Sequence, residues 1–358
     1  MSPARALPAF DEAGFKRLAT TGFFAPAAGP RDLIRRYRRL GERGTPLGFG
    51  VSCVAHQISV ELIAHYGTQA QKLRAQAPLQ SGEWIGAIAN TEGTGGTDIR
   101  SMASRVENGL LHSTKNCFTN GPADLIFLSA WTEDKLEVLM IEGTRLTQED
   151  LRFELAGFRS GRTGSLTARG LPIDLDTDRL GQAGQGFEIL KFCFDLERLM
   201  ISALIQGTLS RTEKELVRAF QERRSFGKNL VDHQWVQDKA IEVRKAHYLL
   251  RGLLEICALD YREHKGFAAG LRALNTPLSL LKWQAVDHGI TALTAAFEAG
   301  GVRSLQDEAP LLTLLTDLYH LKFLGGTREL QKSFLWQDLL QGYEESQHEQ
   351  IRAAQKAG

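Results

Sequence analysis

A long apolar stretch in the second half of the chain, FEILKFCFDLERLMISALI at residues 187–205, contains one compact charged run. The run is Asp195-Leu196-Glu197-Arg198, and the apolar spacing around it is that of a helix. Charges in such a setting are costly unless they are paired or functional. A partly buried glutamate has a raised pKa, which suits a general base near neutral pH. A Glu–Arg pair on a polar surface is the equally weighted alternative.

Helical patterns continue after this stretch. The apolar spacing from Leu311 to Phe323 predicts one such helix. Two further stripes at i+3/i+4 steps are Val236, Ala240, Val243, Ala246, Leu250, Leu253 and Cys257, and Leu278, Leu281, Ala285, Ile290 and Leu293. Several long amphipathic helices in sequence favour an antiparallel bundle.

The residues before this stretch divide into two zones with different patterns of apolar residues. Residues 9–80 carry helical spacing, which Gly48 and Gly50 are expected to break. From about residue 83 to residue 178, short apolar runs alternate with glycine-rich turns, which predicts a small antiparallel β domain. The predicted domains are therefore 1–82 (helical), 83–180 (β) and 181–358 (helical bundle).

Composition excludes several classes of function. The 358 residues carry a formal net charge of +1, so we expect no nucleic-acid partner and no anionic membrane surface. The four cysteines form no CxxC motif, which argues against a structural zinc site and a secreted disulfide scaffold. No metal site and no membrane span are predicted, and a reduced, cytoplasmic setting is the simplest interpretation.

A glycine-rich loop, TEGTGGTD at residues 91–98, follows an apolar strand. Its glycines let the backbone approach a ligand closely, and its threonines add hydroxyl donors. It is neither a P-loop nor a dinucleotide fingerprint, and a plain hairpin turn is the favoured alternative when the loop is taken alone.

Two further motifs fit a phosphate-bearing ligand only in combination. Arg223-Arg224-Ser225-Phe226-Gly227-Lys228 presents guanidinium forks suited to phosphate, although cations at a helix C-terminus also offset the helix dipole. Gly325-Gly326-Thr327-Arg328-Glu329 joins two predicted helices and equally fits ordinary cap chemistry.

Taken together and in this order, the motifs resemble the acyl-CoA dehydrogenase family. TEGTGGTD resembles the family's TEPGAGSD loop, and Lys115-x-x-Phe118-Thr119-Asn120 resembles its KxWITN segment. GQAGQG at residues 181–186 resembles the turn into the bundle, and the Glu197-Arg198 pair, the RSFG block and the GGT motif complete the series. The resemblance runs from about residue 67 to about residue 345.

The resemblance implies an α+β, mostly α fold: a helical N-terminal domain, a middle antiparallel β-barrel and a C-terminal four-helix bundle. It implies FAD between barrel and bundle in a homodimer or homotetramer. The cofactor-binding positions it implies are Thr91, Gly96, Thr97, Thr119, Arg223, Ser225, Phe226, Gln234, Gly301, Thr327 and Glu329. Among these, Arg223, Ser225 and Gln234 would serve the neighbouring subunit's FAD. The substrate-binding positions are Asp195, Arg198 and Gly325.

The implied activity is α,β-dehydrogenation of an acyl thioester, either acyl-CoA or acyl-carrier protein. In this family a glutamate removes the Cα proton while a hydride passes from Cβ to flavin N5, and an electron-transfer flavoprotein or oxygen then accepts the electrons. Most members carry the glutamate immediately before the GT pair, where this sequence has Gly325. A minority, including isovaleryl-CoA dehydrogenase, place it just before the helix arginine, which makes Glu197 the expected catalytic base.

Other departures from the family pattern keep two alternatives open. Cys117 replaces a tryptophan beside the flavin, Phe297 stands near a usual cofactor-contacting glutamine, and Thr316 replaces an arginine. Gly325 and Cys117 favour a flavin-dependent monooxygenase or oxidase on the same fold. Phe297 and the imperfect TEGTGGTD loop motivate a non-catalytic scaffold subunit.

Overall fold

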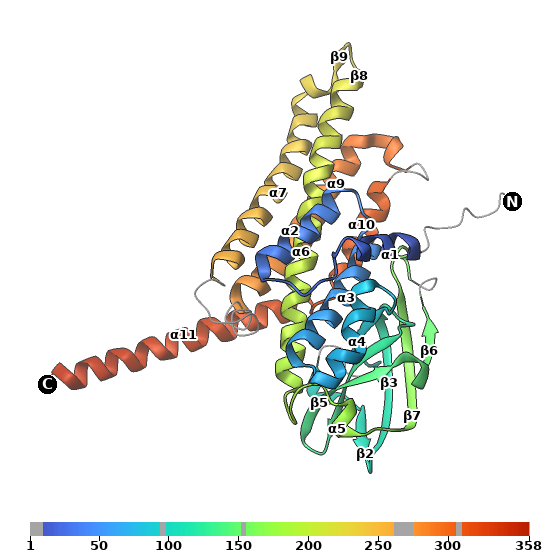
Figure 1. Ribbon diagram of the computed structural model, residues 1–358. Coiled ribbons are helices and arrows are strands. Elements are labelled where there is room, and N and C mark those ends of the chain that lie inside the picture. Colours follow the sequence, from blue (N-terminus) through green and yellow to red (C-terminus); the bar gives the residue numbers. More distant parts are fainter. Residues whose placement is uncertain (1–9, 94–97, 152–154, 261–274, 306–309, 358) are drawn as a thin grey trace.

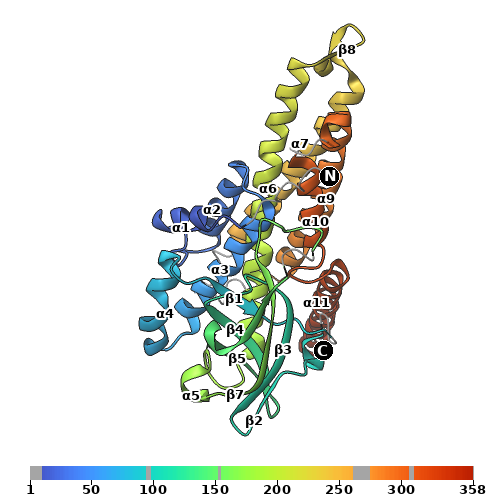
Figure 2. The ribbon, with the colours of Figure 1, turned by 90° about the vertical axis from the view of Figure 1, so that its right-hand side faces the viewer.

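The chain forms a helical N-terminal part, a central sheet and a long C-terminal helical bundle (Figure 1). The computed structural model describes residues 10–93, 98–151, 155–260, 275–305 and 310–357. The N-terminal helices are α1 (Glu12–Thr20), α2 (Pro30–Glu42), α3 (Leu47–Tyr66) and α4 (Gln69–Ser81). In Figure 2 they lie on the left, beside α6 and the sheet.

The central sheet has the strand order β1-β4-β2-β3-β7-β6, with β5 paired to β4. Its strands are β1 (Gly86–Ala89), β2 (Arg105–Glu107), β3 (Leu110–Thr119), β4 (Leu125–Thr132), β5 (Lys135–Glu142), β6 (Thr147–Asp150) and β7 (Thr163–Pro172). Pairing is antiparallel in β2–β3, β3–β7, β4–β5 and β6–β7, and parallel where β4 meets β1 and β2. Buried and exposed residues alternate along most of β3, as expected for a strand that faces a core on one side.

The C-terminal bundle is built around α6 (Gly186–Glu222), which runs most of the length of the molecule (Figure 1). The other helices are α7 (Gln234–Asp260), α9 (Asn275–Gly300), α10 (Pro310–Leu321) and α11 (Arg328–Ala357). The strands β8 (Arg224–Ser225) and β9 (Lys228–Asn229) form a hairpin between α6 and α7. The predicted order of helices, sheet and helices is confirmed.

Helix α3 is the most apolar element of the core. By length and composition alone it could cross a membrane, but 94% of its apolar window is buried inside the protein, as expected for a core helix. Its polar side chains are paired within the fold: His56 contacts the Leu79 carbonyl at 2.9 Å and accepts from the Gly86 N–H at 3.1 Å. Burial lowers the pKa of His56 to about 4, which fits a neutral structural imidazole.

Gly48 and Gly50 do not break the helix, as the sequence had suggested, but lie inside the first turn of α3. A Cβ on Gly48 would come within 2.8 Å of the Ser160 hydroxyl, and one on Gly50 within 2.5 Å of the Leu204 side chain. These glycines therefore let α3 pack directly against the sheet's connecting loop and against α6.

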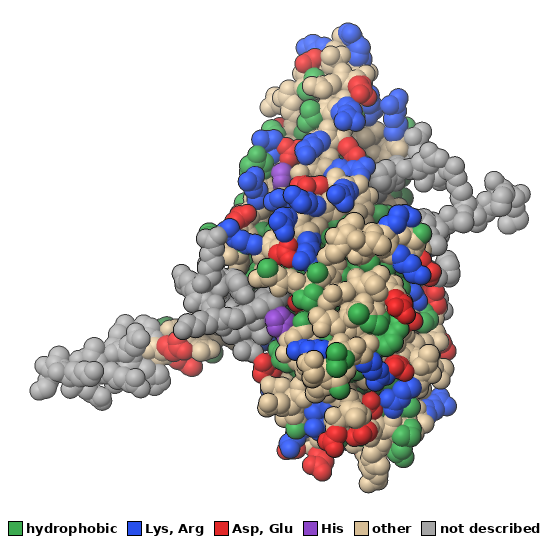
Figure 3. Space-filling model, viewed as in Figure 1, with side chains coloured by type: hydrophobic (Ala, Val, Ile, Leu, Met, Phe, Trp, Pro, Cys, Tyr) green, Lys and Arg blue, Asp and Glu red, His purple; other side chains and the backbone are tan. Residues whose placement is uncertain are grey.

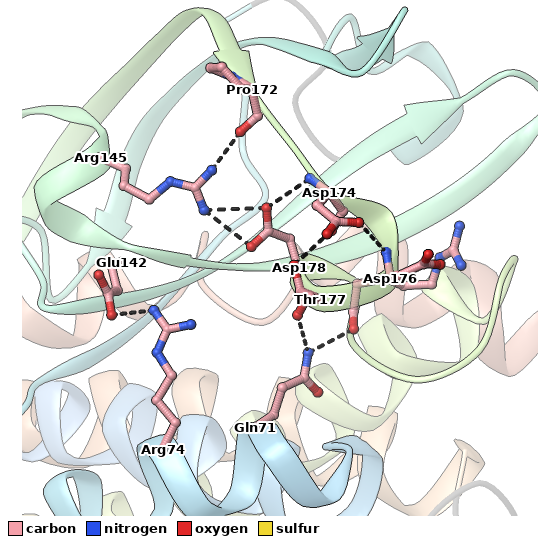
Figure 4. A network of polar contacts seen from close by, with 10 residues as sticks. Gln71, Arg74, Glu142, Arg145, Pro172, Asp174, Asp176, Thr177 and Asp178 are labelled. Atoms are coloured by element: carbon pink, nitrogen blue, oxygen red, sulfur yellow. Dashed lines mark hydrogen bonds and ion pairs between the residues drawn. The ribbon is translucent and has the colours of Figure 1, made fainter.

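A polar network joins α4 to the far end of the sheet (Figure 4). The Gln71 amide donates to the Thr177 and Arg179 carbonyls, both at 2.9 Å, next to the short helix α5 (Leu175–Asp178). Arg145 pairs with Asp178 at 3.1 Å. These bonds fix the N-terminal helices on the sheet independently of the bundle.

The surface carries both signs of charge, in agreement with the net charge of +1. Lys and Arg side chains gather over the upper part of the face in Figure 3, where α2, α6 and α7 lie, and acidic side chains are more frequent toward the lower end. Arg31, Arg35 and Arg39 of α2 are exposed, and Arg35 is paired with Asp32 at 2.7 Å.

Helices α2 and α6 approach each other through a pair of glycines. A Cβ on Gly207 would lie 2.0 Å from the Arg38 carbonyl oxygen, and one on Gly41 would lie 2.3 Å from the Leu204 carbonyl oxygen. Backbone atoms cannot swing aside as the end of a side chain can, so a methyl group at either position would force the two helices apart.

The variant Gly207→Ala is therefore expected to lower the free energy of unfolding by about 1–3 kcal/mol, because overpacking outweighs the gain in helix propensity. Gly252→Ala is the matched control, since no described residue lies within 4 Å of a Cβ at this exposed position of α7. It should raise the free energy of unfolding by about 0.5–1 kcal/mol. Urea unfolding followed by circular dichroism measures both, and equal effects would contradict this account of the α2–α6 contact.

Candidate active site

A cavity of about 760 Å³ lies between the sheet, α3, α6 and the turn that joins α10 to α11. This volume falls within the ~300–1,000 Å³ of small-molecule and cofactor sites. The lining is mainly apolar and includes Val51, Ile58, Ile88, Leu190, Phe194 and Leu324. Five of the residues predicted for the site line it: Thr91, Thr119, Glu197, Arg198 and Gly325. Residues distant in sequence thus converge on one hollow.

Glu197 brings a carboxylate into this cavity from the middle of α6. Its side chain is only partly exposed, and burial raises its pKa to about 7 against the opposing charges of Lys282 and Arg198. A carboxylate with this pKa is ionised in a large fraction of molecules near neutral pH and still binds a proton readily. Both properties are required of a general base.

Gly325, at the position where most of the family carry their glutamate, lies directly beside Glu197. A Cβ on Gly325 would be 3.4 Å from Glu197 Oε2. The carboxylate from α6 therefore occupies the space next to the position from which a side chain of residue 325 would start. Gly325 has a φ of +66°, a conformation that favours glycine over other residues.

Arg198 and Asp195 form the polar contacts that fix the backbone next to Glu197. The Arg198 Nε donates to the Gly325 carbonyl at 3.3 Å, and its Nη1 pairs with Asp195 at 3.4 Å. Asp195 is fully buried, is also paired with Lys191 at 2.6 Å, and does not line the cavity. Burial raises the pKa of Asp195, although both cations oppose this effect. Asp195 thus supports Arg198 and Lys191, which do reach the cavity.

Two residues of this site were missed in the sequence. Lys282 of α9 is 2% exposed and donates to the Leu321 carbonyl at 2.7 Å. Gln331 of α11 is fully buried and donates to the Gly325 carbonyl at 2.9 Å. The signal for Lys282 was present, because it follows Leu281 on the apolar stripe of its helix, at a position where a lysine is not expected.

The glycine-rich loop is anchored by a buried ion pair. Lys115 Nζ lies 2.7 Å from Glu92 Oε1, and Glu92 Oε2 accepts from the Ala103 N–H at 2.6 Å. Burial raises the pKa of Glu92, but the hydrogen bonds from Lys115, Ser104 and Ala103 outweigh it and hold this pKa below its usual value. This pair fixes Thr91 at the cavity wall.

The opposite end of this wall is the irregular end of β3. Cys117 has a φ of +52° at a register shift between Lys115 and Phe118, and it lines the cavity together with Thr119. The Cys117 side chain is exposed, so the position at which the family carries tryptophan is open to the cavity here.

The arginine block lies away from the cavity. Arg223, Ser225 and Phe226 belong to the β8–β9 hairpin region at the upper end of Figure 1, and Gln234 begins α7 nearby. The Arg223 guanidinium donates to the Gly300 carbonyl at 3.3 Å, which brings it close to Gly301. Phe226 is 90% exposed. One chain therefore does not bring these five predicted residues to the Glu197 cavity.

The remaining predicted residues have local roles or lie outside the described part. The Thr327 hydroxyl accepts from the Leu330 N–H at 3.3 Å and caps α11, and Glu329 is exposed and pairs with Arg328 at 3.1 Å. Gly96 and Thr97 lie outside the described residues.

Residues 184–340 match the family described as acyl-CoA dehydrogenase, C-terminal domain. The short-chain acyl-CoA dehydrogenase of Megasphaera elsdenii is 25% identical over 281 residues, which cover 75% of this chain and 71% of that protein. Residues 184–340 are thus similar to the C-terminal domain of acyl-CoA dehydrogenases, and three quarters of the chain resembles one of these oxidoreductases at low identity.

Solved structures agree with this family at the level of the fold. The butyryl-CoA dehydrogenase of Megasphaera elsdenii superposes with a TM-score of 0.83 at 21% identity, covering 93% of this chain and 91% of that one. The prolyl acyl carrier protein oxidase AnaB superposes with a TM-score of 0.84 at 23% identity, covering 92% and 91%. The acyl-CoA dehydrogenase fold predicted from the sequence motifs is therefore confirmed.

The raised pKa of Glu197 makes stability depend on pH. The folded state holds this proton more tightly than the unfolded state, in which the pKa is near its ordinary value of 4.5. Stability should therefore fall as pH rises from about 4.5 to about 7. In Glu197→Gln this fall should be smaller by roughly 1–3 kcal/mol, since one pKa unit corresponds to 1.36 kcal/mol.

The measurement is urea unfolding at pH 5 and pH 7.5 for the wild type and the variant. Glu215→Gln, on the exposed face of the same helix and paired with Arg211, is the matched control and should keep the full pH dependence. An unchanged pH dependence in Glu197→Gln would contradict the assigned burial of this carboxylate.

Proposed function

We propose that this chain catalyses the FAD-dependent α,β-dehydrogenation of an acyl thioester, with Glu197 as the base that removes the Cα proton. One observation carries the proposal: the Glu197 carboxylate faces the cavity 3.4 Å from the Cβ position of residue 325. The family's alternative base is thus present in space where its usual base is missing. Similarity to the acyl-CoA dehydrogenase family supports the reaction class, and the geometry around Gly325 supports the residue.

The residues around the cavity fit a flavin ring. The volume of about 760 Å³ is bounded on one side by the hydroxyl-bearing Thr91 and Thr119 and on the other by apolar residues of α3 and α6. Hydroxyls suit the polar edge of an isoalloxazine, and apolar walls suit its faces. When bound, the flavin supplies a hydride acceptor at N5. Glu197 lines the same cavity, so its carboxylate would be close to both the flavin ring and the substrate.

Glu197 acts on the proton. The Cα–H bond breaks as its proton passes to a Glu197 carboxylate oxygen, while the hydride leaves Cβ, so that a Cα=Cβ double bond forms. The apolar walls exclude water, which strengthens the electrostatic interactions of the carboxylate. A base with a pKa of about 7 suits this transfer at neutral pH.

Arg198 and Lys191 are the candidates for the polar arm of the thioester. Both line the cavity and both are held by the buried Asp195. A thioester on CoA and one on a carrier protein share the phosphopantetheine arm, so these residues serve either substrate. The similarity in fold to the prolyl acyl carrier protein oxidase AnaB supports the carrier-bound form as one of the two.

We further propose a homodimer or homotetramer in a cytoplasmic setting, in which Arg223, Ser225 and Gln234 hold the pyrophosphate and adenosine side of the neighbouring subunit's FAD. Large apolar side chains around this region are exposed: Phe226 is 90% exposed and Trp235 is 53% exposed. Exposed apolar surface of this kind is typical of an interface between chains.

An oxidase activity is the second candidate, and Cys117 favours it. This exposed side chain replaces a tryptophan beside the flavin and leaves room at the cavity wall. Oxygen would then take the electrons in place of an electron-transfer flavoprotein. Rapid reoxidation of the substrate-reduced protein by dissolved oxygen would support the oxidase, and slow reoxidation would support the dehydrogenase.

The variant Glu197→Gln is expected to slow anaerobic flavin reduction by an acyl thioester about 10²–10⁴-fold, because a general base contributes about that much. Stopped-flow absorbance at 450 nm with a panel of acyl-CoA and acyl-carrier thioesters measures the rate and identifies the substrate class. Glu215→Gln should reduce at the wild-type rate. Unchanged reduction in Glu197→Gln would assign the proton to another group.

The variant Arg223→Ala is expected to weaken FAD retention roughly tenfold or more, because a charge-assisted bond to phosphate contributes about 1.5–3 kcal/mol. The measurement is the FAD content after dialysis against increasing salt, with subunit mass from analytical ultracentrifugation. Arg31→Ala, an exposed arginine of α2, is the control and should retain FAD. Equal retention in all three proteins would exclude Arg223 from the cofactor site.

A further inference from the structure

Lys282 is a buried lysine that the family-level account of the reaction does not use. It lies on α9 with 2% of its surface exposed, while its neighbours Leu278, Leu281 and Ala285 are fully buried. An ammonium group in such a place costs free energy that a leucine or methionine would not cost. Burial lowers the pKa of Lys282 to about 8, so the group is still mainly charged at neutral pH.

The contacts of Lys282 all concern the turn beside Glu197. Its Nζ donates to the Leu321 carbonyl at 2.7 Å and lies 3.5 Å from the Gly326 carbonyl oxygen. Its Cε lies 3.6 Å from the Cβ position of Gly325, and Glu197 Oε2 lies 3.4 Å from the same position. Lysine and glutamate therefore approach Gly325 together, from two different helices.

We propose that Lys282 is a positioning residue of this site, which fixes the turn between α10 and α11 and stabilises the ionised carboxylate of Glu197. The role of Glu197 as base is that of the proposed function, on which this inference rests. Gln331 already donates to the Gly325 carbonyl and, at 3.3 Å, to the Gly326 carbonyl, so hydrogen bonding to the turn does not by itself require a charge. The positive charge of Lys282 is instead explained by its attraction to the carboxylate of Glu197.

Two clusters of charged groups near Glu197 are paired internally. On α6, Asp195 is paired with both Lys191 and Arg198. The negative charge of Asp195 therefore offsets part of the positive charge that these two residues would otherwise direct at Glu197. On the sheet side, Glu92 is paired with Lys115. Among the described residues, Asp98, Arg100, Cys117 and Cys193 also line the cavity or adjoin Glu197, and Asp287 faces Lys282 on its own helix.

By contrast, the hydrogen bonds of Lys282 go to neutral carbonyl groups, so its charge is not cancelled by them. Glu197 is the strongest favourable charge acting on Lys282, and Lys282 is the strongest favourable charge acting on Glu197. Both side chains come within 4 Å of the Cβ position of Gly325, and an opposite charge close to a carboxyl group lowers its pKa. Without Lys282, Glu197 would therefore hold its proton at neutral pH and lose its ability to accept another.

The test is the titration of Glu197 in the flavin-containing protein by infrared difference spectroscopy, with the carboxyl band assigned by its loss in Glu197→Gln. Lys282→Gln removes the charge and keeps a donor for the Leu321 carbonyl. The carboxyl pKa is expected to rise by roughly one unit or more in this variant. Lys282→Arg keeps the charge and should titrate near the wild type.

Gln331→Met is the matched control, because it removes hydrogen bonds to the same turn without changing charge. It should leave the carboxyl titration in place. If Lys282→Gln leaves the titration unmoved, or if Gln331→Met moves it equally, Lys282 has no electrostatic role and the proposal is overturned. Should Lys282→Gln fail to fold, Lys282→Met, which also removes the charge and is similar in length, takes its place in the same titration.

The acid limb of the pH profile of flavin reduction provides the second measurement. It should move to higher pH in Lys282→Gln by the same amount as the carboxyl titration. A shifted titration combined with normal reduction in Glu197→Gln would retain the Lys282–Glu197 coupling and reject Glu197 as the base. The two proposals therefore fail separately.

Discussion

The structure depends on one arrangement that costs folding free energy: a core helix holds a carboxylate among the apolar side chains that line the cavity. Glu197 lies on α6 between fully buried residues, and its ionised form is disfavoured by burial. The nearby cations Arg198 and Lys282 offset part of this cost, and both are themselves held by the turn at Gly325 and Gly326. The turn, the two cations and the carboxylate thus form one unit, in which each member limits the freedom of the others.

This unit explains why three separate parts of the chain must be rigidly joined. The α10–α11 turn defines the space in front of Glu197, α9 supplies Lys282, and the sheet supplies the threonine-bearing wall. The Glu92–Lys115 pair fixes that wall from behind, and the Gln71 network fixes the sheet on the N-terminal helices (Figure 4). Close glycine contacts between α2 and α6 lock the bundle helix itself. Displacement of any of these parts would change the surroundings of one carboxylate.

The divergence of this chain from its solved relatives leaves the scaffold intact. Solved structures near 20% identity superpose over more than nine-tenths of the chain, so the fold tolerates replacement of most of its side chains. Gly325, Cys117 and the position of Glu197 are changes in the cavity. Such changes alter which groups meet the flavin and the substrate, and they are where a distinct substrate or electron acceptor would be selected.

The sequence by itself determined the order of helices and strands, because hydrophobic period and turn residues are local properties. It also pointed to Glu197, since an acidic residue in an apolar helix is anomalous wherever the helix packs. The sequence did not reveal that Gly48 and Gly50 lie inside a helix, because their use is a contact with residues more than one hundred positions away. It also did not bring Lys282 and Gln331 to Glu197 or separate Arg223 from the cavity. Those relations are distances between elements, and only the packing of the whole chain decides them.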